Sequence, residues 1–360
     1  MTSIRKDNYM ITIRSRLVAV LLGCLLLAAA CASDDGSTET DAAPTEDSAT
    51  EDTAVEDTAV ASDNTGIEDA AYPVTVTSCG EQVVVEARPE RVVPYTDAQT
   101  ELFVALGLAD VVVGEIWDFE ALVRPENEEE VRAVEALATD SWPSREQVAA
   151  LEPDFIFANA YFFDEVAPVE DFESTGAVAY LPADGCPEPP ADVFAGQIAD
   201  IENLGLIFGV QDRADELVEE LRGGLDELTD ALADVEPTPV LWVDYIFDDD
   251  RGVQLISSEF YAETVGLGGG ELLLAGRDDT PSQEQVVAAE PDVLFITDIF
   301  GRSGYETTPE ERSEQVFGLL TNAPATAAEA WAPMPITPRT AIGYVDQVRA
   351  VAEVLHPDAL

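Results

Sequence analysis

The side chains that most enzymes use for chemistry are scarce in this sequence of 360 residues. Its one histidine, His356, precedes a proline near the end of the sequence, so neither a histidine-based triad nor an imidazole-rich metal site is expected. The glycines at 266–270 follow a predicted helix and lack the spacing of a dinucleotide site. The acids at 248–250 lack the glycine and distal glutamate of a calcium loop. We therefore expect no catalytic residue, no resident cofactor and no metal ion.

Large aromatic residues and arginines instead follow several of the predicted strands. Open parallel sheets bind ligands at the carboxyl ends of their strands, so these side chains are candidates for ligand contacts. Aromatic rings with one or two arginines suit a bulky, partly apolar ligand that carries negative charge. Ordinary core packing is the alternative for any single ring. The candidate ligand-binding residues are Tyr95, Trp117, Trp142, Tyr161, Tyr245, Arg302, Trp331 and Arg339.

A stretch of fifteen residues, 143–157, returns at 281–295 with ten identical positions. In both copies a serine stands three residues before a glutamine, which is the capping box that begins a helix. A Glu-Pro pair then ends the helix, because the residue before proline is disfavoured in the α region. An apolar run follows and predicts a buried strand. The repeat therefore predicts two similar α/β lobes, at 73–210 and 236–360.

Helices and strands alternate along the rest of the chain, which favours parallel sheets. Apolar residues from Ala214 to Leu232 recur with the helical period, so one long helix is expected over about 211–234, with a possible bend at Gly223 and Gly224. A hairpin is expected at 74–85. The other predicted elements are helices at 98–106, 144–151, 192–209, 259–266 and 343–355, and strands at 111–113, 155–158, 177–180, 239–243 and 293–296.

The first 72 residues carry targeting and tether signals rather than a fold. Basic residues followed by an apolar run make 1–31 a predicted secretory signal, and the small residues before Cys31 make it the predicted lipidation site, with Cys24 as the alternative. At about 14 residues the run is shorter than the ~20 that span a bilayer. The segment 32–72 is acidic and without bases, and we expect an extended linker there.

Two cysteines, Cys79 and Cys186, remain in the part expected to fold. In an exported protein such a pair predicts a disulfide, with a metal site built from two thiols as the weaker alternative.

The formal net charge of the chain is -56 at pH 7. Beyond the signal, thirteen arginines and no lysine stand against an excess of acids, so no basic surface exists to bind nucleic acid. Acidity of this kind affects solubility and salt tolerance and says nothing about the fold.

Taken together, several motifs resemble the substrate-binding lipoproteins of ABC importers for ferric siderophores, haem and vitamin B12. Proteins of this family have two Rossmann-like lobes with mainly parallel sheets joined by one long α-helix, and they hold their ligand between the lobes. The resemblance makes 211–235 the expected connecting helix, and the Cys79 and Cys186 pair is similar to that of a subset of the family. The motifs stand in family order at 89–93, 100–107, 113–114, 143–154, 204–214, 281–292 and 355–360.

The resemblance implies a ferric siderophore-type ligand, captured with modest lobe closure and delivered to a membrane permease and its ATPase. Haem, cobalamin or a non-transporting scaffold role are the alternatives. One glutamate per lobe is expected to dock on the permease, at Glu146 and Glu284; a favourable helix-dipole position is the simpler explanation for each. Trp142 and Arg339 lie near positions where the family contacts ligand, although 331–339 departs from the commoner pattern. The protein is expected to be a monomer, lipid-anchored on the outer face of the cytoplasmic membrane.

Overall fold

The computed structural model describes most of the chain from Tyr72 onward, and these residues belong to one compact unit, Ser62–Leu360. The predicted signal with Cys24 and Cys31, and the predicted linker up to residue 71, lie outside the described residues. The described ranges are 72–118, 123–138, 142–188, 190–246, 253–276, 281–298, 307–321, 323–336 and 340–360.

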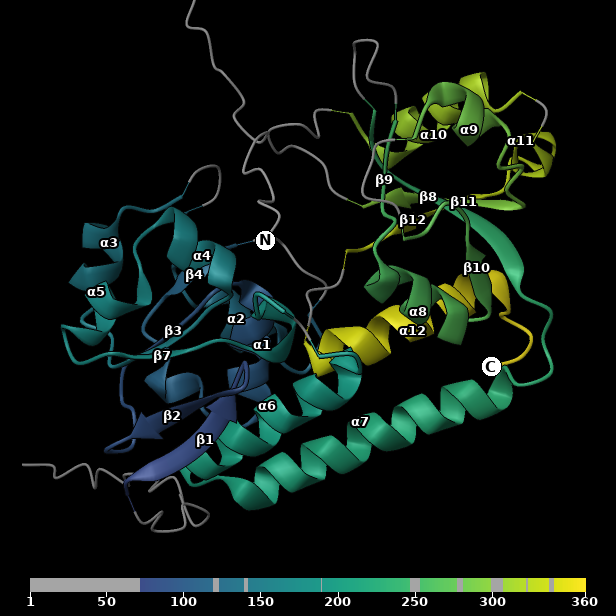
Figure 1. The fold of residues 1–360 in the computed structure, drawn as a ribbon. Coiled ribbons are helices and arrows are strands. Elements are labelled where there is room, and N and C mark those ends of the chain that lie inside the picture. Colours follow the sequence, from purple (N-terminus) through teal and green to yellow (C-terminus); the bar gives the residue numbers. More distant parts are fainter. Residues whose placement is uncertain are drawn as a thin grey trace, which may run out of the picture. The chain divides into compact units, whose positions relative to one another are not determined.

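The N-terminal lobe begins with the predicted hairpin and continues into parallel strands (Figure 1). The hairpin strands β1 (Val74–Ser78) and β2 (Glu81–Val85) pair antiparallel. Strands β3 (Val92–Pro94), β6 (Phe155–Phe157) and β7 (Val178–Tyr180) form a parallel sheet in the order β3-β6-β7. The separate parallel pair β4 (Glu115–Trp117) and β5 (Ala136–Ala138) meets the β3 segment through two isolated bridges, Val92↔Val112 and Thr96↔Trp117.

The predicted strand at 111–113 is wrong in its position. Ala109–Val111 is a 3₁₀ helix, η1, and the strand is β4, so Trp117 ends this strand instead of following it. The two bridges are four residues apart along the β3 segment (Val92 to Thr96) but five residues apart along the β4 segment (Val112 to Trp117). The extra residue interrupts the ladder as a bulge does, and this leaves Val112 with a single bridge.

Short helices connect the strands of this lobe, and α1 agrees closely with its prediction. Helix α1 is followed by Gly107 at a φ of 74°, which glycine adopts without the steric cost that other residues meet. The helices are α1 (Asp97–Ala105), α2 (Glu128–Arg132), α3 (Arg145–Ala150), α4 (Ala160–Glu165) and α5 (Val169–Glu173), with the 3₁₀ helix η2 at Ala183–Gly185.

Two longer helices follow, and both were predicted. Helix α6 (Val193–Phe208) ends at Gly209 in the left-handed conformation, and α7 (Gln211–Ala231) runs on through both central glycines. The apolar stripe of α7 is buried at Ala214, Leu217, Leu221 and Leu228. The long helix is therefore amphipathic, as its sequence period indicated, and packs along α6 (Figure 1).

The C-terminal lobe contains a five-stranded sheet of order β10-β8-β11-β12, with β9 antiparallel on β8. The other neighbours in this sheet are parallel. Its strands are β8 (Thr238–Ile246), β9 (Val253–Leu255), β10 (Gly270–Leu272), β11 (Val293–Thr297) and β12 (Trp331–Met334). Its helices are α8 (Glu259–Leu267), α9 (Gln283–Val287), α10 (Pro309–Leu319), α11 (Pro324–Ala328) and α12 (Ala341–Leu355).

Both copies of the repeat fold alike. The Ser144 hydroxyl accepts a bond from the Gln147 amide at 3.3 Å, and the Gln147 side chain accepts one from the Ser144 amide at 2.8 Å. Ser282 and Gln285 repeat this capping box at 3.3 and 2.9 Å. The helix stops are also matched, because the residues before the two prolines, Glu152 and Glu290, have φ values of 48° and 49°.

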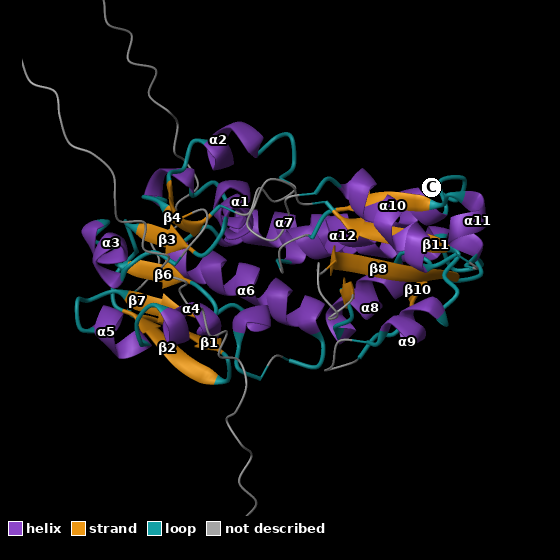
Figure 2. Ribbon diagram, turned by 90° about the horizontal axis from the view of Figure 1, so that it is seen from above, coloured by secondary structure: helices purple, strands orange, loops and turns teal. Residues whose placement is uncertain are grey.

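The fold is α/β with two lobes of mainly parallel strands and a long helix between them in sequence, as predicted. Seen from above, the strands of each lobe are flanked by helices (Figure 2). One core cluster combines one face of the N-terminal sheet with α6, α7 and the first half of α12, and a second cluster lies on the other face of that sheet. Separate clusters also lie on the two faces of the C-terminal sheet. The exact lobe boundaries, 73–210, 211–235 and 236–360, stay a prediction.

Candidate ligand-binding site

Four of the predicted ligand-binding residues meet in the N-terminal lobe. The Trp142 ring stacks on Tyr95 with the centroids 6.0 Å apart, and it meets Trp117 edge-on at 5.1 Å and Tyr161 at 5.4 Å. Phe162 completes the group, at 6.3 Å from both Tyr95 and Trp142. We call these five residues the aromatic cluster.

The positions of these rings follow from the strand ends. Tyr95 comes directly after β3, Trp117 ends β4, and Trp142 and Tyr161 follow β5 and β6 by a few residues. All four strands are parallel to their neighbours, so their carboxyl ends lie at one edge of the lobe. This is the edge at which open α/β sheets bind ligands.

Tyr161 differs from its prediction in one respect, because it lies in the first turn of α4 and not in a loop. The Asn159 side chain accepts a bond from the Phe162 amide at 2.8 Å and thereby caps this helix. Within the cluster Tyr161 is 57% exposed, whereas Phe162 is fully buried. The cluster thus combines a rigid base with an accessible aromatic edge.

Asn159 and Phe162 are functional candidates that sequence reasoning missed. Burial raises the pKa of Tyr95 to about 12, and the side-chain hydrogen bond to Asn159 opposes this effect. Tyr95 therefore stays a neutral phenol at physiological pH. The available signal was the Asn at the end of β6, which is a preferred N-cap residue ahead of an aromatic run.

Carboxylates border the aromatic cluster where β4 meets α1. Arg132 bonds to Asp97 at 3.0 Å and lies 3.8 Å from Asp118, the residue after Trp117. Glu115 is only 3% exposed, and the Thr100 hydroxyl donates to it at 2.6 Å. Burial above all, with the charges of Asp97 and Asp118, raises the pKa of Glu115 to about 8. Glu115 is therefore largely protonated at neutral pH.

The two candidates of the C-terminal lobe that the structure describes, Tyr245 and Trp331, lie inside strands and not in loops. Trp331 is the first residue of β12, where it pairs with Leu294 and packs on the core of that lobe, so its expected place after a strand is wrong. Tyr245 lies inside β8, next to a β-bulge, and not in the loop beyond. Arg302 and Arg339 lie outside the described residues.

Glu146 and Glu284 occupy equivalent places in the two lobes. Each is exposed and lies in the first turn of a capped helix, α3 or α9. A carboxylate in the first helical turn is stabilised by the helix dipole, typically by ~0.3–1 kcal/mol. Both side chains are accessible to a partner.

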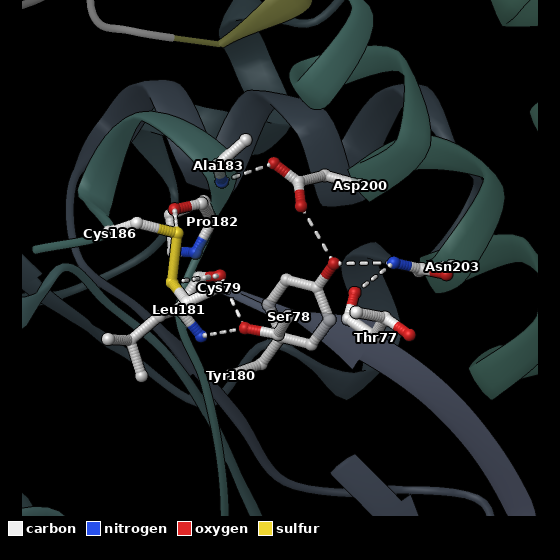
Figure 3. Close-up of a disulfide and its surroundings, with 10 residues drawn as sticks. All are labelled: Thr77, Ser78, Cys79, Tyr180, Leu181, Pro182, Ala183, Cys186, Asp200 and Asn203. Carbon is white, nitrogen blue, oxygen red and sulfur yellow. Dashed lines mark hydrogen bonds between the residues drawn. A yellow bond between two sulfur atoms is a disulfide. The ribbon is translucent and has the colours of Figure 1, made fainter. Parts of the chain in front are cut away.

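Cys79 and Cys186 form the predicted disulfide, with an S–S distance of 2.04 Å (Figure 3). It joins the β1–β2 turn to the segment after η2, 107 residues away in sequence. Beside it, Asp200 accepts bonds from the Tyr180 hydroxyl at 2.7 Å and the Ala183 amide at 2.8 Å. The hairpin is therefore fixed to the lobe covalently, and the Asn203 side chain ties it to this polar network by donating to the Thr77 carbonyl at 3.0 Å and to the Tyr180 hydroxyl at 2.9 Å.

Within the described ranges, no group of three or more metal-ligating side chains occurs. No helix among the same residues is long and apolar enough to cross a membrane. Among the described residues, the aromatic cluster is a candidate for ligand contacts, because it presents aromatic rings at the edge where open α/β sheets bind ligands.

Comparison with known proteins identifies the class of this protein. The family model described as periplasmic binding protein matches residues 92–297, more than half of the chain. The chain belongs to this family. The match begins at β3 and ends with β11, so it includes both copies of the repeat.

Among curated proteins, the uncharacterized ABC transporter substrate-binding lipoprotein YvrC of Bacillus subtilis is 26% identical over 311 residues, which are 80% of this chain and 87% of that protein. Among solved structures, an Fe³⁺-hydroxamate transport protein of Saccharomonospora viridis is 21% identical with a TM-score of 0.64, and covers 79% of this chain and 100% of its own. The periplasmic haem-binding protein RhuT of Roseiflexus is 19% identical with a TM-score of 0.55, over 74% and 98%. At these identities the two structures establish the fold.

Proposed function

We propose that this protein captures a ferric siderophore-type chelate and delivers it to the permease and ATPase of an ABC importer. The observation that carries the proposal is the aromatic cluster at the strand-end edge of the N-terminal lobe. Its exposed Tyr161 and half-buried Trp142 offer ring surface to the apolar periphery of a bulky ligand. Arg302 and Arg339 are proposed to supply positive charge from the other lobe.

The curated relative supports a transport function, and one of the solved structures supports a ferric siderophore-type ligand. YvrC is an ABC transporter substrate-binding lipoprotein, and the Saccharomonospora protein belongs to an Fe³⁺-hydroxamate transport system. Haem is the second candidate, because the Roseiflexus relative binds haem and a flat macrocycle would also stack on aromatic rings.

Fluorescence titration of the purified protein tests this proposal directly. Trp117 and Trp142 lie within the aromatic cluster, so a bound iron chelate should quench their emission. We expect quenching by at least one member of a panel of ferric siderophores. Quenching by haemin alone or cobalamin alone would overturn the siderophore assignment, and no binding by any of the three classes would overturn the transport function.

Glu146 and Glu284 are proposed to dock onto cationic side chains of the permease. The matched capping boxes place the two carboxylates at the same position, the second residue of a capped helix, on the two lobes. We expect the E146K/E284K variant to lose uptake at least tenfold while its ligand affinity stays within twofold. The control E170K/E259K changes exposed first-turn glutamates of α5 and α8 and should retain uptake. Equal losses in both variants would contradict the docking role.

The protein is proposed to act outside the cytoplasmic membrane, held by a lipid on Cys31. Labelling of growing cells with a radioactive fatty acid checks this assignment. The C31A variant should lose the label and C24A should keep it, because only one of the two cysteines becomes the modified N-terminus. The reverse pattern would assign the lipid to Cys24.

A further inference from the structure

Helix α12 is shared by the cores of both lobes. Its first half contributes Ile342, Tyr344 and Val348 to the cluster that contains the N-terminal sheet, α6 and α7. Its second half contributes Val351 to the cluster on one face of the C-terminal sheet, with Leu355 packed against it. One helix of 15 residues therefore connects two separately formed sheets.

Tyr344 shows this connection in detail. Its ring lies 4.9 Å from Phe194 of α6 and 5.7 Å from Phe260 of α8, measured between centroids. From Phe260 the ring contacts continue into the C-terminal lobe, where Phe260 meets Tyr261 and Tyr261 meets Trp242 of β8, both at 5.1 Å between centroids. Apolar packing of this kind fixes α12 against both lobes but carries little directional information.

Directional contacts hold α12 on both sides. On the C-terminal side the Tyr344 hydroxyl hydrogen-bonds to Glu263 of α8, and on the N-terminal side the contacts come from Arg124, which lies between β4 and α2. Its guanidinium donates two bonds to the Asp346 carboxylate, from Nε at 3.1 Å and from Nη2 at 3.0 Å. Its Nη1 donates to Glu220 of α7 at 2.7 Å. A bidentate guanidinium–carboxylate pair fixes distance and orientation together. One side chain of the N-terminal lobe thus binds both α7 and α12.

Arg124 is itself anchored to its own lobe. Its backbone amide donates to the buried Glu101 of α1 at 2.8 Å, and the Asn127 side chain donates to the same carboxylate oxygen at 3.0 Å. Arg124 and Asp346 are only 19% and 18% exposed, whereas Glu220 is 55% exposed. Burial alone would lower the pKa of Arg124, but its bonds to Asp346 and Glu220 outweigh burial and raise it. The Arg124–Asp346 pair is thus the better shielded of the two.

The Arg124–Asp346 pair joins residues that are much farther apart in sequence than other ion pairs between described residues. Arg132 with Asp97, Arg145 with Asp171 and Arg213 with Glu216 join residues no more than 35 apart in sequence, whereas Arg124 and Asp346 are 222 apart. Arg145 and Asp171 provide a comparison, because they meet at a similar distance, 2.9 Å, within one lobe and at exposed positions.

We propose that α12 is a strap between the lobes and that Arg124 is its clasp, which holds the first half of α12 on the N-terminal lobe through Asp346 and sets the resting arrangement of the two lobes. Release of the clasp leaves both sheets folded but frees the strap at one end. The amplitude of lobe movement is then controlled by α12 as well as by the long helix α7. This inference concerns the lobes alone and does not depend on the identity of the ligand.

Hydrogen exchange of the ligand-free full chain tests the clasp. In R124Q we expect the amides of the first half of α12, up to Val348, to exchange at least tenfold faster, while β8 and β11 change less than twofold. D346N should produce the same pattern. The exchange rates of the double variant should exceed those of the stronger single variant by less than twofold, because both single changes break the same Arg124–Asp346 contact. R145Q, which breaks the exposed pair within one lobe, should leave α12 unchanged.

Distance measurements between the lobes provide the second readout. Spin labels on non-natural amino acids at Glu173 and Glu310, exposed positions on α5 and α10, report how widely the lobe arrangement varies. A broader distance distribution in R124Q and D346N, but not in R145Q, is expected. Wild-type exchange of α12 in both R124Q and D346N, or equal broadening in R145Q, would overturn the proposal.

Discussion

The two lobes carry the same repeat and both contain large aromatic residues, yet they use them differently. In the N-terminal lobe, Tyr95, Trp117 and Trp142 follow or end parallel strands and meet at one edge. In the C-terminal lobe, Trp331 starts its strand and packs on the core instead. The position of an aromatic residue relative to the strand direction, and not its type, therefore decides whether it lies at the carboxyl-end edge of the sheet.

The largest contrast between the lobes should come from the disulfide, which is found in the N-terminal lobe. Replacing Cys79 and Cys186 by serine removes a cross-link over 107 residues, which should lower the free energy of unfolding by about 4 kcal/mol. Hydrogen exchange should show the greatest loss of protection in β1, β2 and β7. An equal loss in β8 and β11 would show that the two lobes do not differ in this respect.

A second contrast concerns pH. Glu115 has its pKa raised from 4.5 to about 8, so the stability that its neutral form contributes is fully present below pH 4.5 and is lost as the pH rises through about 8. The wild-type protein should lose about 4 kcal/mol more than E115Q between pH 5 and pH 9.

Chemical denaturation at both pH values measures this difference. E128Q, at an exposed position in the first turn of α2, is the control and should follow the wild type at each pH. Parallel curves for wild type and E115Q would contradict the buried, protonated state of Glu115.

The third prediction addresses the aromatic comparison itself. W142A should weaken binding of whichever chelate quenches the wild type by about 2 kcal/mol, roughly thirtyfold, because Trp142 contacts all four other rings of the cluster. W331A should lower stability and leave affinity within threefold. Calorimetric titration distinguishes them, and a larger affinity loss in W331A would reverse the assignment of the ligand face.

The smallest effects should come from the caps and should be alike in the two lobes. S144A and S282A each remove a hydroxyl that accepts a bond from a glutamine amide, at a cost of about 1 kcal/mol. Denaturant titration of both variants checks this equality. A cost in one copy alone would mean that the repeats, despite matched hydrogen bonds, differ in energetic role.

Local signals in the sequence predicted much of the fold. Ser144 and Ser282 begin helices, Gly107 and Gly209 end them, and the apolar stripe of α7 marks its buried face, because each effect acts within a few residues along the chain. The disulfide followed from cysteine counting. The meeting of Tyr95, Trp117, Trp142 and Tyr161 followed from the rule that parallel strands align their carboxyl ends.

Features that depend on register between distant segments could not be predicted. The start of β12 at Trp331 and the shift of β4 to Glu115 are determined by pairing with other strands. The contact of Arg124 with Asp346 joins residues 222 apart, and no pattern within either segment indicates the other. Glu115 was also missed, because the burial that perturbs it comes from the packing of α1 on β4.

The core cluster that α12 completes constrains the order in which the protein folds. Its members extend from Val76 to Val348, so this cluster cannot close until both of these distant segments are available to pack. One face of the N-terminal sheet therefore keeps some apolar surface exposed until α12, the last described helix, packs against it. Contacts between such distant segments form slowly, and exposed intermediates of this kind aggregate. Chains in which α12 has not yet packed should consequently be the form most prone to aggregation.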